Sequence, residues 1–217
     1  MDKSITDIIF DLDGTLIDSA PSILECFKSV LILNNIEPLR PLSLDLIGPP
    51  LAQTLSHLTG IHELVALNKL AEDFKKYYDF GGYKSTVPFL GITELLEECC
   101  FCGFGLHVAT NKRLLPTNLI LDHLGWRKHF KSIYTIDSSS PPFQNKATML
   151  SALLKNEKIV LNSAVYIGDR LEDSQSAMQN SLRFLGATWG YQDEKLLSNE
   201  AITSCHTIKQ FSQYLNS

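Results

Sequence analysis

The chain has 217 residues, of which 44% are hydrophobic and 20% charged, enough for one α/β domain with a modest insertion. Its formal net charge is -5, and the sequence contains no basic patch that would attract a nucleic acid or a membrane surface. No segment approaches the roughly 18 apolar residues of a membrane helix, and the N-terminal residues lack an export signal, so we expect a cytoplasmic protein. The five cysteines show no metal-ligand spacing, which favours reduced thiols.

The first expected element is a short β-prone run from Asp7 to Leu12, which ends in the turn-forming sequence Asp-Gly-Thr. A helix start follows at Ser19-Ala-Pro21, and apolar residues then recur at i, i+4, i+7 and i+8 from Ile23. Helix-like sequence continues to about Tyr78, interrupted by prolines and a Gly-Pro-Pro turn. Residues 16–85 show no alternation of period two, so we expect an all-helical insertion there.

Beyond residue 88, short apolar runs alternate with predicted helices. The runs cover residues 106–109, 133–136, 164–167 and 182–187, and the helices lie around 91–101, 114–124, 146–155 and 171–180. This alternation predicts an α/β fold with a Rossmann-like parallel sheet and helices on both of its faces. We therefore expect a core formed by residues 1–15 and 86–217, into which the helical segment 16–85 is inserted.

Polar residues follow the expected strands at the edge of the sheet where ligands bind in such folds. They are Asp11, Asp13, Gly14 and Thr15 after the first strand, Thr110 and Asn111 after the second, Lys146 in a loop after the third, and Asp169 and Asp173 after the fourth. Carboxylates gathered at one edge repel one another unless a cation lies between them. Ligands that are all oxygen suit Mg²⁺, which usually keeps waters and shares phosphate oxygens.

This set of residue types fits phosphoryl transfer. A carboxylate can attack phosphorus and form a mixed anhydride that water later hydrolyses. The charge on the phosphoryl oxygens needs a metal, a lysine, a hydroxyl and backbone N–H groups. A second acid must protonate the leaving alkoxide and then take a proton from water, and Asp13, two residues beyond Asp11, could do this.

The same residues resemble the four ordered motifs of the haloacid dehalogenase-like hydrolases, over nearly the whole chain. The motifs are Asp11-Leu-Asp13-Gly14-Thr15-Leu, Thr110-Asn111, Lys146 and Gly168-Asp169-Arg170-Leu-Glu-Asp173. The helical insertion after the first motif resembles the cap domain of the phosphoglycolate phosphatase-type members. Ile47-Gly48-Pro49-Pro50-Leu51 and Thr188-Trp189-Gly190-Tyr191 resemble further stretches of that subgroup.

The resemblance implies a role for each motif residue. Asp11 would be the nucleophile and Asp13 the acid and base. Mg²⁺ would be held by the Asp11 carboxylate, the Asp13 main-chain carbonyl and Asp169, with Asp173 beside the metal site. The phosphate would be bound by Thr110, Lys146 and the loop at Gly14, while Asn111 either donates to the phosphate or only supports Thr110.

Several functions remain open at this point. The favoured one is a phosphatase for a small phosphomonoester with a phosphoglycolate-like substrate, and a nucleoside 5'-monophosphate phosphatase is the alternative. A phosphomutase needs a second phosphate site, and no dense basic cluster is visible between residues 16 and 85. A carbon–halogen hydrolase has little use for Asp13, because no alkoxide is protonated. A non-catalytic regulator of the same fold is the alternative outside enzymes.

Overall fold

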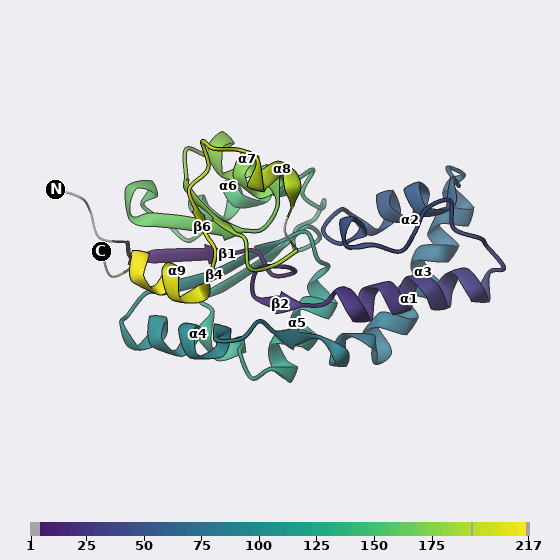
Figure 1. Cartoon of the computed structure of the whole chain (residues 1–217), viewed down its shortest axis with the longest axis horizontal. Coiled ribbons are helices and arrows are strands. Elements are labelled where there is room, and N and C mark those ends of the chain that lie inside the picture. Colours follow the sequence, from purple (N-terminus) through teal and green to yellow (C-terminus); the bar gives the residue numbers. More distant parts are fainter. Residues whose placement is uncertain (1–4, 192, 216–217) are drawn as a thin grey trace.

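A computed structural model describes residues 5–191 and 193–215 and contains a six-stranded parallel sheet in the order β5-β4-β1-β6-β7-β8. The strands are β1 (Asp7–Phe10), β4 (Gly105–Thr110), β5 (Ser132–Thr135), β6 (Ala164–Gly168), β7 (Arg183–Ala187) and β8 (Ser204–Cys205). Helices cover both faces of this sheet (Figure 1). The predicted α/β fold with a Rossmann-like core is therefore confirmed.

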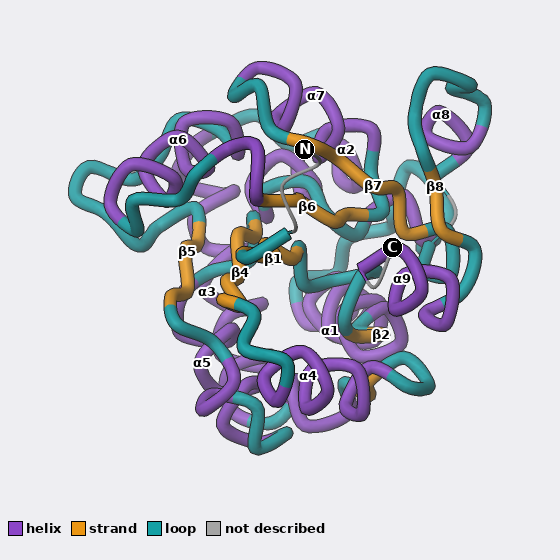
Figure 2. Tube along the Cα trace, turned by 90° about the vertical axis from the view of Figure 1, so that its left-hand side faces the viewer, coloured by secondary structure: helices purple, strands orange, loops and turns teal. Residues whose placement is uncertain are grey.

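Side chains alternate between the two faces of the sheet, as the two-residue period of a strand requires. On one face, Ile8 and Phe10 of β1 join a cluster with α4 (Ile92–Phe101) and α5 (Leu114–His123). On the other face, Ile9 packs with α6 (Lys146–Asn156) and α7 (Leu171–Gln179). Figure 2 shows the strands crossing the middle of the molecule between these two pairs of helices. Burial on both faces explains why the strands read as continuous apolar runs.

The segment after β1 forms helices beyond one end of the sheet (Figure 1). They are α1 (Ala20–Leu33), α2 (Leu51–Thr59) and α3 (Leu64–Phe80), with short 3-10 turns at Leu44–Leu46 and Gly82–Ser85. These helices share a second hydrophobic cluster, in which Phe27, Phe74 and Tyr78 are buried and which Tyr191 of the core also joins. Burial of apolar side chains in this cluster stabilises the packing of the inserted helices against one another.

The sequence predicts helices throughout 16–85, whereas the structure has a two-residue strand, β2 (Ile17–Asp18), at the start of this range. It pairs antiparallel with β3 (Val87–Pro88), where the chain returns to the sheet. The two connections run side by side, so their backbone groups hydrogen-bond to each other. The division into a core of 1–15 and 86–217 and an insertion of 16–85 stays a prediction.

The segment after β7 contains three elements that the sequence does not predict: α8 (Glu194–Leu197), β8 and α9 (Ile208–Leu215). α9 docks through Phe211, which is fully buried and meets Phe10 of β1 edge to face, with ring centroids 6.1 Å apart. This contact ties the C-terminal segment to the strand that leads to Asp11. None of the described helices has both the length and the apolar character needed to cross a membrane.

We predict that Phe211→Ala lowers the free energy of unfolding by about 3–5 kcal/mol, because it empties a fully buried site against the sheet. Phe101→Ala is the matched control, since Phe101 is 93% exposed and its removal should change stability by less than about 0.5 kcal/mol. Urea unfolding of both variants measures the difference. Equal losses in the two variants would contradict the docking of α9 through Phe211.

Candidate active site

The three central strands end side by side at one edge of the sheet. β1 pairs with β4 and β6 so that Phe10 lies level with Val108 and Ile167. The residues that follow these positions therefore gather at the same edge. Asp11 and Asp169 meet there, and Thr110 lines a pocket of about 260 Å³ together with Asp11. Carboxyl ends of parallel strands are the usual binding edge of such sheets.

Asp11, Asp169 and Asp173 form a group of buried carboxylates that could hold a metal ion. One oxygen from each lies within 4.8 Å of the others, and their side chains are at most 7% exposed. Asp169 Oδ2 is buried without a hydrogen-bond partner among the described residues. A buried carboxylate oxygen without a donor is costly, and a hard divalent cation would satisfy it. The residues present therefore fit a site for a divalent cation.

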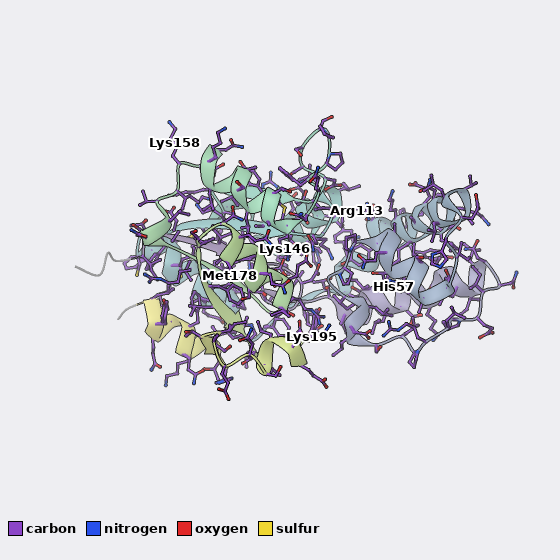
Figure 3. The ribbon with its side chains drawn as sticks, turned by 90° about the horizontal axis from the view of Figure 1, so that it is seen from above. His57, Arg113, Lys146, Lys158, Met178 and Lys195 are labelled. Atoms are coloured by element: carbon purple, nitrogen blue, oxygen red, sulfur yellow. The ribbon has the colours of Figure 1, made fainter. Side chains whose placement is uncertain are left out.

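Lys146 supplies the buried cation in this group. Its Nζ lies 3.0 Å from Asp11 Oδ1 and 2.5 Å from Asp173 Oδ1. Lys146 is the first residue of α6, and the Asn145 side chain caps that helix by accepting from the Thr148 N–H. Figure 3 shows Lys146 within the core, away from the helices of the insertion. The structure thus brings Lys146 to Asp11 from 135 residues away in the sequence.

Burial has a large effect on the titration of these acids. It raises the pKa of Asp11 to about 7, against the opposing attraction of Lys146 and with further repulsion from Asp173 and Asp13. The pKa of Asp169 is also raised well above its usual value, first by burial and then by Asp11 and Asp173. The ionised forms of Asp11 and Asp169 are thus disfavoured unless a positive charge lies close to them. Both shifts indicate a site that favours a bound cation at neutral pH.

Asp13 lies beside this group and is oriented by two donors. Lys112 Nζ lies 3.0 and 3.2 Å from its two carboxylate oxygens, and the Ser19 hydroxyl also donates to it. The same ammonium lies 4.7 Å from the centre of the Tyr78 ring of α3. Burial lowers the pKa of Lys112, but Asp13 and the Tyr78 contact raise it above the ordinary value. Lys112 therefore stays charged and holds Asp13 next to the insertion.

Thr110 and Asn111 are placed differently, although they are adjacent in sequence. Thr110 is 2% exposed, and its Oγ1 accepts from the backbone N–H of Lys112 at 3.2 Å. The Asn111 amide instead donates to the Glu172 carboxylate at 3.1 and 3.2 Å and to the Gly48 carbonyl at 3.4 Å. Asn111 therefore links the site to the insertion, and its contact with phosphate stays a prediction.

Gly14 lets the loop after β1 pass close to Asp169. Its φ is +85°, and a Cβ at this position would collide with the Asp169 carboxylate and the Tyr191 ring. Its N–H donates to the Ile17 carbonyl at 2.9 Å and is thus already used inside the loop. The structure therefore gives Gly14 a role in making room for Asp169, while its contact with phosphate stays a prediction.

Sequence reasoning assigned no role to Lys112 or Arg170. Arg170 Nη2 donates to the carbonyls of Leu44 and Ile47 in the insertion, at 2.9 and 3.0 Å, and its Nε lies 3.5 Å from Asp169 Oδ2. Arg170 thus connects a loop of the insertion to the carboxylate group. Each of the two directly follows a predicted site residue near a strand end, and this position is the only signal in the sequence that could have suggested a role near the site.

Comparisons with known proteins agree with this geometry. A sequence profile of the family described as haloacid dehalogenase-like hydrolase matches residues 8–187, and the chain belongs to this family. It is 30% identical over 212 residues to a 5'-nucleotidase of Pseudomonas aeruginosa, covering 97% of this chain and 95% of that protein. A phosphoglycolate phosphatase of Xanthomonas campestris is 28% identical over 203 residues and 89% of both chains. The crystal structure of a predicted phosphatase from Clostridium acetobutylicum superposes on this chain with a TM-score of 0.87. The match covers 99% of both chains at 26% sequence identity.

We predict that Gly14→Ala destabilises the protein more than Gly103→Ala does. The two glycines have almost the same φ, +85° and +84°, so both variants carry a backbone strain of about 1–3 kcal/mol. Only at Gly14 does the added methyl group also meet buried side chains, whereas nothing lies within 4 Å of it at Gly103. Urea unfolding measures the two losses. A loss at Gly14 no larger than at Gly103 would show that Asp169 is not packed against this loop.

Proposed function

We propose that this protein is a magnesium-dependent phosphatase that hydrolyses a small phosphomonoester through a phosphoaspartyl intermediate on Asp11. The observation that carries the proposal is the buried group of Asp11, Asp169 and Asp173 around Lys146, with Asp13 next to it. The chain's membership of the haloacid dehalogenase-like hydrolase family and its similarity to a phosphoglycolate phosphatase support the same reaction class.

In this proposal the Asp11 carboxylate attacks phosphorus and forms a mixed anhydride with the phosphoryl group. Lys146 orients Asp11 through the 3.0 Å contact and binds a phosphoryl oxygen once substrate is present. Thr110 lines the same small pocket and offers its hydroxyl to a second phosphoryl oxygen. The group is buried, so bulk water is kept from the anhydride until the alcohol has left.

Asp13 acts as the general acid and the general base. It donates a proton to the leaving alkoxide in the first step and takes one from the attacking water in the second. Its carboxylate lies on the side of the site that faces the insertion, where Lys112 and Ser19 hold its orientation. The leaving alcohol must then lie on that side as well.

Magnesium would be held by the carboxylates of Asp11 and Asp169 and the main-chain carbonyl of Asp13, with Asp173 beside it. When bound, it supplies positive charge that stabilises the phosphoryl oxygens during transfer. Asp169 fits this role because it offers a buried oxygen that accepts no hydrogen bond from the described residues. Asp173 lies beside the site, where it anchors Lys146 and accepts from the Arg170 N–H at 3.0 Å.

The substrate is proposed only as a class. The relatives named phosphoglycolate phosphatase and 5'-nucleotidase represent the two predicted substrate types, a phosphoglycolate-like ester and a nucleoside 5'-monophosphate. Either is a small metabolite of the cytoplasm, the proposed location of this chain. The phosphomutase, carbon–halogen hydrolase and non-catalytic alternatives have no observation in their favour among the described residues.

We predict that chelation of divalent cations abolishes phosphate release and that Mg²⁺ restores it. Added Mg²⁺ should also raise the melting temperature, because a ligand at 100 times its Kd stabilises the folded state by about 2.7 kcal/mol. Asp169→Asn should lose both responses while remaining folded, since it removes a metal ligand and a buried charge. Phosphate-release assays and thermal unfolding with and without Mg²⁺ measure the two effects.

Asp122→Asn is the matched control, because Asp122 is an exposed residue of α5 outside the carboxylate group. It should keep both responses to Mg²⁺. Full activity in excess chelator, or an undiminished response to Mg²⁺ in Asp169→Asn, would refute the metal assignment.

A further inference from the structure

A second pocket lies between the core and the insertion. It is open to solvent on one side and is lined by residues of both parts. Helices α1, α2 and α3 form one side of it, and residues 111–113 after β4 form the other. Figure 3 shows Arg113 at the boundary between the core and the insertion.

This pocket continues directly from the pocket that contains Asp11. Asp13, Gly48, Asn111 and Lys112 line both of them. Asp13 is the proposed donor of a proton to the leaving oxygen, so that oxygen must lie at this shared boundary. The rest of the alcohol then extends away from the phosphoryl group and into the second pocket.

The walls of the second pocket are mainly apolar and partly aromatic. They include Ile23, Phe27, Leu51, Phe74 and Tyr78. The Phe27 and Phe74 ring centroids are 4.7 Å apart, and the Phe74 and Tyr78 rings stack at 5.7 Å. Such walls favour an apolar or aromatic group, and they penalise a carboxylate that loses its water without gaining a partner.

Both cations that line this pocket already have carboxylate partners. Lys112 contacts both oxygens of Asp13, and Arg113 donates to both oxygens of Asp79, at 2.9 and 2.6 Å. Among the described residues of the lining, no lysine or arginine is left unpaired for a carboxylate on the substrate. Paired charges of this kind offer little to an incoming anion.

We propose that the substrate is a phosphomonoester of an uncharged alcohol that carries an apolar or aromatic ring, and that this pocket selects it against esters of hydroxy acids. The inference rests on the proposed phosphatase function and adds the chemical class of the leaving group. It runs against the phosphoglycolate-like substrate favoured by the sequence. Leu51, a half-buried residue at the start of α2, is a specificity-determining position in this account.

The test compares kcat/KM for three phosphomonoesters of primary alcohols. Ethyl phosphate is the reference, 2-phosphoglycolate replaces its methyl group with a carboxylate, and benzyl phosphate replaces it with a ring. We expect benzyl phosphate to exceed ethyl phosphate at least tenfold and 2-phosphoglycolate to fall below ethyl phosphate. The inference is overturned if 2-phosphoglycolate exceeds ethyl phosphate or if benzyl phosphate does not.

Leu51→Lys places an unpaired cation in the pocket. It should raise the ratio of 2-phosphoglycolate to ethyl phosphate at least tenfold and lower the ratio of benzyl to ethyl phosphate. Leu64→Lys is the matched control, because Leu64 is likewise the first residue of a helix in the insertion but is 71% exposed and does not line the pocket. It should change both ratios by less than twofold, and unchanged ratios in folded Leu51→Lys would count against the pocket.

Binding of phosphonates separates this inference from the phosphatase proposal. The non-hydrolysable counterparts are propylphosphonate, 3-phosphonopropionate and 2-phenylethylphosphonate, and calorimetry with Mg²⁺ measures their affinities for the wild-type chain. Tightest binding of the phenyl compound without hydrolysis of any ester would overturn the phosphatase and support the pocket. Turnover with a preference for the carboxylate compounds would support the phosphatase and overturn the pocket inference. Absence of both binding and turnover would overturn the two proposals together.

Discussion

The burial of three carboxylates around one lysine is the constraint on which the rest of the structure depends. Asp11 follows β1, whereas Asp169 and Asp173 follow β6, and the pairing of these two parallel strands brings the three acids together. Lys146 only partly offsets their mutual repulsion. Burial raises the pKa of Asp11 to about 7 and that of Asp169 well above its usual value. The hydrophobic clusters on both faces of the sheet stabilise this arrangement, and a divalent cation would remove most of its cost.

The insertion is connected to this group through polar contacts rather than through the sheet. Arg170 reaches the carbonyls of Leu44 and Ile47, Lys112 reaches the Tyr78 ring, and each lies next to an acid of the site. The same insertion supplies the apolar walls of the second pocket. In the proposed mechanism the leaving group would therefore lie against the same part of the molecule that orients the acids.

Much of the fold follows from patterns in the sequence, because continuous apolar runs and amphipathic helices report burial directly. Once the strands are predicted to be parallel, their carboxyl ends place Asp11, Thr110 and Asp169 at one edge of the sheet, as the structure shows. What the sequence does not reveal depends on tertiary contacts. The roles of Lys112 and Arg170 require knowing where the insertion lies, and α9 has too short a pattern to be separated from a loop until Phe211 is seen against the sheet.

The most direct measurement is the chemical trapping of the phosphorylated residue. The protein is mixed with Mg²⁺ and a hydrolysed ester, quenched in acid, and treated with borohydride, which reduces an aspartyl phosphate to homoserine. Peptide mass spectrometry then identifies the position. The account predicts homoserine at position 11 only. Homoserine at another carboxylate, or none at position 11 while turnover proceeds, would contradict the central claim that Asp11 is the nucleophile.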